Sequence, residues 1–169
     1  MTPATSIVFS SFLSAADPMP RAWVRFRQQL LAGDESASGT LDASENGRVS
    51  VWRLIASNNR ELGRSSRLYG SFEQARDDAI AVRGSAERLR IDSVHGPTAG
   101  THGWFASFDE QLPVMTCGRW YGALGSSVEA AHQSIEALTC AVVNDSGHRL
   151  LWPDRRRSVH ERVSESSPH

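Results

Sequence analysis

The chain contains the same sequence pattern twice, and this internal repeat limits the folds that it can form. The first copy runs from Val49 to Asp92 and the second from Thr101 to Val143. Landmarks match in a fixed order: Ala56-Ser57 and Leu62 with Ala106-Ser107 and Leu112 at a spacing of fifty, Tyr69-Gly70 with Tyr121-Gly122 at fifty-two, and Phe72, Ala75, Ala79 and Val82 with Val128, Ala131, Ile135 and Leu138 at fifty-six. The growing spacing predicts small insertions, all in turns. Two units that each have an open sheet edge and one apolar face can satisfy both by joining.

Each copy has the pattern of a β-β-β-α-β unit. In the first copy, residues 49–56 are rich in β-branched and aromatic residues, which is typical of a strand, and residues 61–65 and 67–69 follow as shorter strands. Ser71 is in position to cap a helix that carries an apolar stripe and ends at Gly84. Residues 88–94 alternate as a final strand. In the second copy the closing strand is expected at Cys140 to Val143, with His148 to Trp152 as a further candidate.

The flanking segments divide the rest of the chain. Residues 1–20 show no single pattern, and their three prolines limit any helix. The segment Trp23 to Leu31 carries an amphipathic stripe that predicts a helix, packed on its own domain in preference to binding a partner or forming only on contact. The predicted organisation is an N-terminal amphipathic segment and linker (1–47), a first repeat (48–95), a second repeat (101–152) and a disordered tail (153–169).

The run Trp52-Arg53-Leu54-Ile55-Ala56-Ser57-Asn58, followed by Tyr69-Gly70-Ser71 and the small-residue helix, resembles the YegP-like family of small bacterial and archaeal domains of unknown function. The resemblance covers about 100 of the 169 residues. It implies α+β units that join into one continuous antiparallel sheet, with helices on one face and last strands exchanged. Asp78, whose counterpart is Ser134, departs from the Gly that family members usually have. The family brings no catalytic or ligand residue.

Charge and composition exclude some function classes. A net charge of −1 supplies no overall attraction to nucleic acid or anionic lipid. Residues 48–92 carry nine Arg against six carboxylates, whereas residues 102–152 carry two Arg against five, so the two copies, at +3 and −3, favour pairing with each other. This predicts a monomer with an internal pseudo-twofold axis, compatible with a weak dimer. No run is apolar enough for a membrane span. The segment SIVFSSFLSAA lacks a preceding Arg or Lys, so we expect a cytoplasmic protein.

Groups that do chemistry are scattered along the chain. No phosphate-binding loop, nucleophile elbow or metal motif occurs, so no cofactor and no metal is expected. Cys117 and Cys140 are interpreted as small apolar core residues. His95 and His102 bracket a loop, and a metal site with Cys117 is the less favoured alternative.

The tripeptide Arg119-Trp120-Tyr121 is the most interaction-like in the core, because a guanidinium beside two aromatics can anchor a partner. The alternative is that an aromatic fills the core while Arg119 is solvated. Arg155, Arg156 and Arg157 form a basic cluster in the tail. We therefore expect a non-enzymatic protein-interaction or regulatory module, with nucleic-acid binding through these residues as the second hypothesis and an enzyme as the third.

Overall fold

The computed structural model describes residues 4–32, 47–109 and 112–150, with side chains up to Asp145. Most of the predicted linker and the whole tail from residue 153 lie outside this part of the chain. Its elements are β1 (Ser6–Phe12), α1 (Pro18–Leu30), β2 (Val49–Ile55), β3 (Glu61–Ser65), α2 (Phe72–Gly84), the 3₁₀ turn η2 (Ala86–Arg88), β4 (Arg90–His95), β5 (His102–Ser107), β6 (Pro113–Thr116), α3 (Leu124–Thr139) and β7 (Val142–Leu150).

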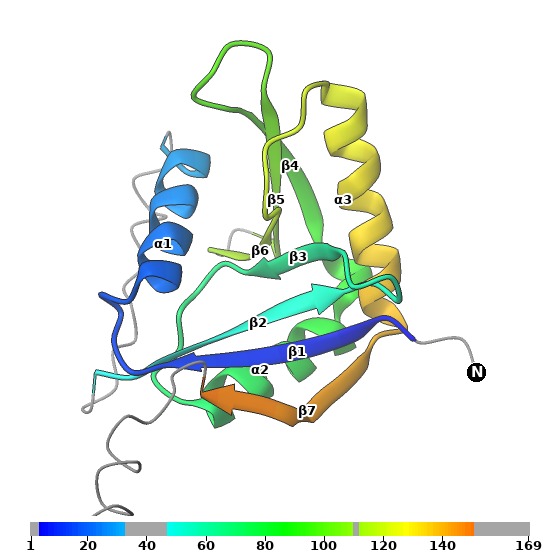
Figure 1. Cartoon of the computed structure of the whole chain (residues 1–169). Coiled ribbons are helices and arrows are strands. Elements are labelled where there is room, and N and C mark those ends of the chain that lie inside the picture. The colour runs from blue at the N-terminus through cyan, green and yellow to red at the C-terminus, as the bar shows by residue number, and fades with distance from the viewer. Residues whose placement is uncertain (1–3, 33–46, 110–111, 151–169) are drawn as a thin grey trace, which may run out of the picture.

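The described strands form one seven-stranded sheet in the order β4-β5-β6-β3-β2-β1-β7, with the helices packed against it (Figure 1). The α+β class predicted from the sequence is confirmed. β4, the last strand of the first half, leaves that half and pairs antiparallel with β5 of the second. β7 in turn crosses to the first half, where it pairs with β1 in parallel. The sheet is therefore mixed and not wholly antiparallel.

The sequence did not predict β1, because Pro3, Pro18 and Pro20 lie on either side of it and residues 1–20 show no single pattern. Its residues Ile7 and Phe9 are buried on one face, while Phe12 is buried on the other. The strand pairs with β2 over its whole length, from Ser6 opposite Ile55 to Phe12 opposite Val49. Residues 6–12 thus belong to the sheet and are not part of a loose N-terminal segment.

One face of the sheet forms the main core with α2 and α3. Trp52 and Leu54 of β2 and Trp104 of β5 are fully buried in it. The helices contribute small and aliphatic residues at helical spacing: Ala75, Ala79 and Val82 from α2, and Ala131, Ser134 and Leu138 from α3. The stripe read from the sequence is the buried face of α2, whereas in α3 its members Val128 and Ile135 are only half-buried. Ser71 accepts a hydrogen bond from the Gln74 backbone NH at 3.2 Å, which is the predicted cap.

α1 covers part of the opposite face, whereas the two repeat helices α2 and α3 share one face, as expected (Figure 1). Because side chains alternate along a strand, Val49 and Val51 of β2 point away from the main core, and both pack in a second cluster with Trp23 of α1. The Trp23 indole Nε1 donates to the carbonyl of Ser65 at 3.0 Å. The helix thus packs on its own domain, as preferred from the sequence. β2 is apolar on both faces because it is covered on both.

The two halves share local contacts at positions whose numbers differ by 52. Each hairpin has a register shift at its turn, between Leu54 and Ile55 in β2 and between Ala106 and Ser107 in β5. The tyrosines make the same isolated bridges, Tyr69 with Ser50 and Tyr121 with His102. The spacing of fifty assigned to the hairpins is therefore wrong by two residues.

The helices follow the same spacing of 52. Both begin three residues after the tyrosine, although α3 has 16 residues and α2 has 13. The buried residues Ala75, Ala79 and Val82 of α2 lie 52 positions before the buried Ser127, Ala131 and Ser134 of α3. The spacing of fifty-six assigned to the stripes is therefore wrong by four residues, which is about one helical turn. The extra length of α3 lies at its C-terminal end, where the first half has the 3₁₀ turn η2. Duplication of the two halves stays a prediction.

Candidate binding pocket

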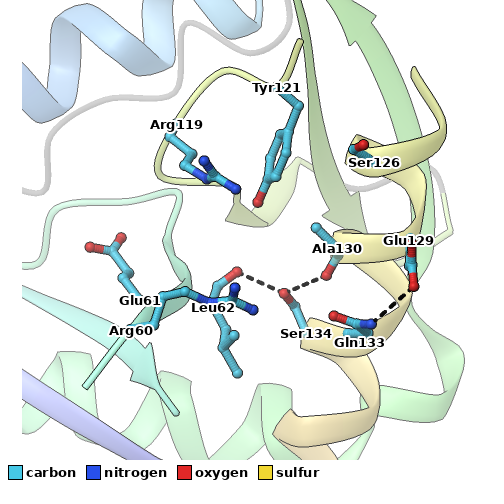
Figure 2. Close-up of a pocket in the computed structure, with 10 residues that line it drawn as sticks. All are labelled: Arg60, Glu61, Leu62, Arg119, Tyr121, Ser126, Glu129, Ala130, Gln133 and Ser134. Atoms are coloured by element: carbon cyan, nitrogen blue, oxygen red, sulfur yellow. Dashed lines mark hydrogen bonds between the residues drawn. The ribbon is translucent and has the colours of Figure 1, made fainter. Parts of the chain in front are cut away.

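A pocket of about 220 Å³ opens between the β2–β3 turn, the segment before α3 and the first half of α3 (Figure 2). Its lining is mainly polar: Arg60, Glu61, Leu62, Arg119, Tyr121, Ser126, Glu129, Ala130, Gln133 and Ser134. The turn is tight because Asn59 adopts a positive φ of 65°, which Asn tolerates better than most residues. This geometry places Arg60 immediately before β3, at the rim of the pocket.

The structure separates the members of the predicted Arg119-Trp120-Tyr121 site. The Arg119 guanidinium carbon lies 4.4 Å from the centre of the Tyr121 ring, and both side chains line the pocket. Such a cation–π contact contributes roughly 0.5–1 kcal/mol at an exposed position. Trp120 instead packs on Phe26 of α1, with ring centres 4.9 Å apart. Arg119 and Tyr121 are therefore available to a ligand, while Trp120 holds α1 in place.

The pocket lining holds two arginines, Arg60 and Arg119, and two glutamates, Glu61 and Glu129. Glu61 is occupied by Arg64, at 2.6 Å, and lies 3.9 Å from Arg53. Arg60 and Arg119 make no ion pair with a carboxylate within the described residues, and both are exposed. Figure 2 shows the Arg60 guanidinium turned toward the interior while the Glu61 carboxylate turns away. The pocket thus presents two arginines without an ion-pair partner in the described residues, against one glutamate, Glu129, that is bonded only to the neutral Gln133 amide.

The first half of α3 forms the remaining wall. Ser126 lies in the first turn, which has no acidic residue and no side-chain cap. The helix dipole therefore adds partial positive charge at this end. Deeper in, the Ser134 hydroxyl lies 2.7 Å from the carbonyl oxygens of both Leu62 and Ala130. Glu129, the one acidic wall residue on α3, accepts a hydrogen bond from Gln133.

A second pocket, of about 550 Å³, lies between α2 and the β5–β6 turn, at the place that matches the first pocket. Its lining includes Leu112, Pro113 and Val114, whose numbers are 52 above those of Arg60, Glu61 and Leu62, together with Arg67 and Asp78. Its hairpin wall is thus apolar where that of the first pocket is charged. The two pockets share a position but not a chemistry.

The Asp78 carboxylate completes a buried polar chain in this first half. The Trp52 indole Nε1 donates to the Tyr69 hydroxyl at 3.3 Å, and Tyr69 donates to Asp78. Burial, then the charge of Asp78 and the hydrogen bond to it, raises the pKa of the Tyr69 hydroxyl far above its ordinary value of 10.0. In the second half Ala130, and not Ser134 as predicted, takes the position of Asp78 at the spacing of 52, and the Trp104 indole Nε1 has no hydrogen-bond partner within the described residues.

No family model matches the sequence, and no curated protein matches it significantly. The chain is similar to one solved structure, the solution NMR structure of yegP, a protein of unknown function from E. coli. The two share 16% sequence identity with a TM-score of 0.48, over 66% of this chain and 90% of that one. It bears the same name as the family that the sequence motifs resemble.

Other predicted residues lie apart from the pocket or outside the described part of the chain. Cys117 is buried, as predicted, with its Sγ accepting from the Trp104 backbone NH at 3.3 Å, whereas Cys140 is exposed at the end of α3 and is not a core residue. The rings of His95 and His102 face each other with centres 5.2 Å apart, but no third metal-ligating group joins them among the described residues. Arg155, Arg156 and Arg157 lie outside the described residues. No described helix has the length and apolar character of a bilayer span.

Sequence reasoning found Arg119 and Tyr121 but missed Arg60 and Ser134. Arg60 was read only as part of a turn, and Ser134 only as the counterpart of Asp78. A usable signal was present in the repeat itself, because a charged residue at one hairpin corresponds to an apolar residue at the other. Reading that difference needed the correct spacing of 52, which the sequence alone did not supply.

Proposed function

We propose that this protein is a non-enzymatic, cytoplasmic protein-interaction module whose pocket binds one anionic group carried by a partner protein. The observation that carries the proposal is the pair of arginines, Arg60 and Arg119, which line one pocket without a carboxylate partner in the described residues. Charge-assisted hydrogen bonds from guanidinium to carboxylate or phosphate are stronger than neutral ones. A site with two such donors favours an anion.

The size of the pocket supports a partner protein in preference to a free metabolite. Its volume of about 220 Å³ is below the range of roughly 300–1,000 Å³ that is usual for small-molecule sites. A cavity of that size accommodates one side chain. The cytoplasmic location is supported by the free thiols Cys117 and Cys140, since disulfides are typical of oxidising compartments.

Nucleic-acid binding is less favoured for a geometric reason. Single strands bind to aromatic platforms on which bases stack. Trp120, the largest aromatic of the predicted site, is instead packed against Phe26. Tyr121 already carries the Arg119 guanidinium on its ring.

The proposal can be tested by fluorescence anisotropy with labelled nine-residue peptides whose central residue is Glu, phosphoserine or Gln. We expect at least one anionic peptide to bind and the Gln peptide not to bind. Removing one charged hydrogen-bond donor costs about 1.5–3 kcal/mol, so Arg119→Gln and Arg60→Gln should each weaken binding by about tenfold or more.

The matched control is Arg25→Gln, which removes an exposed arginine of α1 that does not line the pocket. It should leave the affinity unchanged. A single-stranded DNA 12-mer forms the competing arm. Binding of DNA, but of no peptide, would contradict the proposal in favour of the second hypothesis.

A further inference from the structure

We infer that the anion is a carboxylate, which takes in the second half the place that Asp78 occupies in the first. This inference rests on the proposed function and names the chemistry of the group that the pocket binds. It comes from a difference between the two halves: in one, the half-buried carboxylate of Asp78 accepts from the tyrosine, and in the other no carboxylate holds the matching position.

The first half shows a complete chain of donors and acceptors. The Trp52 indole donates to the Tyr69 hydroxyl, and the Tyr69 hydroxyl donates to the Asp78 carboxylate. Tyr69 is buried, so each of these groups would be costly to leave without a partner. The carboxylate is the terminal acceptor that makes the arrangement stable.

The second half keeps the donors but not the acceptor. Trp104 is fully buried, yet its indole Nε1 has no hydrogen-bond partner in the described part of the chain. Tyr121 lines the pocket, where Figure 2 shows its hydroxyl directed into the interior. The spacing of 52 puts Ala130 in the position of Asp78, and the nearby Ser134 hydroxyl points to the carbonyls of Leu62 and Ala130. An unpaired buried donor costs about 1–3 kcal/mol, so a ligand that restores the chain gains affinity.

The wall residues of the two pockets differ in the same way, because the pocket beside α3 has an additional arginine and no counterpart of Asp78. The pocket beside α2 has the apolar Leu112 where the pocket beside α3 has Arg60. Arg119 corresponds to Arg67, but within its pocket no carboxylate corresponds to Asp78. A carboxylate entering here would accept from the Tyr121 hydroxyl and face both guanidiniums. The Tyr121 oxygen would in turn accept from Trp104, as Tyr69 does from Trp52.

Size favours a carboxylate over a phosphate. The group that the ligand would imitate is the carboxylate of Asp78, which is carried on a short side chain. The pocket of about 220 Å³ is small enough to suit such a group. A phosphoryl group brings an additional oxygen and up to a second negative charge, for which the Tyr121 and Ser134 region offers no further described donor. An acidic side chain or a chain terminus of the partner has the required form.

The test follows the indole resonance of Trp104 in ¹⁵N-labelled protein, assigned with Trp104→Phe, during titration with the Glu, phosphoserine and Gln peptides. We expect the Glu peptide to shift this resonance in a saturable way and to bind at least tenfold more tightly than the phosphoserine peptide. Equal affinity for both anions would overturn the inference. Binding of the Glu peptide without any movement of the Trp104 resonance would also overturn it, and would leave the proposed function standing. Failure of every peptide to bind would instead refute the proposed function.

A variant makes the internal comparison directly. Ala130→Asp supplies this pocket with its own carboxylate at the position that matches Asp78, so it should weaken the Glu peptide at least tenfold and shift the Trp104 resonance without any ligand. The control Ala130→Ser adds a polar group without a charge and should still bind. Unchanged peptide affinity in a folded Ala130→Asp protein would contradict the inference. If that variant does not fold, the titration of the unaltered protein decides.

Discussion

The hydroxyl of Tyr69 is buried between the Trp52 indole and the Asp78 carboxylate. Replacing Asp78 by Ser should leave this hydroxyl without its acceptor and lower the free energy of unfolding by about 1–3 kcal/mol. Urea denaturation followed by circular dichroism measures the change. The neighbouring Asp77→Ser removes an exposed carboxylate from the same helix and should have little effect. Equal destabilisation by both substitutions would contradict a specific role for Asp78.

The same residue predicts how stability depends on pH. Because burial raises the pKa of the folded Tyr69 hydroxyl above its ordinary value of 10.0, the unfolded chain loses this proton first. The stabilisation is fully present below pH 10 and is lost as pH rises above it, by up to about 1.4 kcal/mol per pH unit. Urea midpoints between pH 9 and 11 should therefore fall more steeply for the natural protein than for Tyr69→Phe. Parallel curves would show that Tyr69 ionises equally in both states.

At the scale of single elements, the docking of α1 depends on a residue without a side chain. A Cβ atom at Gly103 of β5 would lie 2.7 Å from Leu30 Cδ1 of α1 and 2.8 Å from Trp120 Cζ3. Gly103→Ala should therefore displace the helix and cost about 1–3 kcal/mol, the usual cost of overpacking. Thermal unfolding measures the loss of stability, and quenching of tryptophan fluorescence measures exposure of Trp23. Gly122→Ala, where a Cβ meets nothing within 4 Å, is the control and should leave both readings unchanged.

Elements with a strong periodic signal were predicted well, and those whose signal depends on the rest of the molecule were not. The stripes of α1, α2 and α3 come from residue spacing that one face of a helix must have, so they can be read locally. β1 is a strand because β2 and β7 pair with it on either side, and its sequence between prolines does not show those neighbours. The position of α1 on the second face likewise depends on its packing against Val49 and Val51. The local sequence shows that these two residues are apolar but not which element covers them.

The candidate site was predicted in part for the same reason. Arg119 and Tyr121 stand close together in the sequence, so their association was visible. Arg60 and Ser134 reach the pocket from other elements, and only the fold brings them there. Trp120 was grouped with its neighbours in the sequence, but its ring packs against Phe26 of α1 and does not line the pocket.

For the molecule as a whole, β1 lies between β2 and β7, so it joins the last described strand to the rest of the sheet. A variant that lacks residues 1–12 loses the strand between β2 and β7, together with the buried side chains Ile7, Phe9 and Phe12. We expect it to lose the cooperative unfolding transition, because burying these three side chains contributes about 1.5–3 kcal/mol each. Calorimetry of the truncated protein tests this. A variant lacking only residues 1–3 is the control. An intact transition in the longer deletion would mean that β7 can pair directly with β2.

The crossing of β4 into the second half has a practical outcome. A break in the exposed loop between Gly96 and Thr101 would produce two pieces, each carrying a strand that belongs in the sheet beside the other's. Neither piece could bury its apolar face by itself, yet the pair holds every contact of the intact sheet. Residues 1–98 and 99–169 are therefore natural fragments for a split reporter, in which two fused proteins would bring the pieces together.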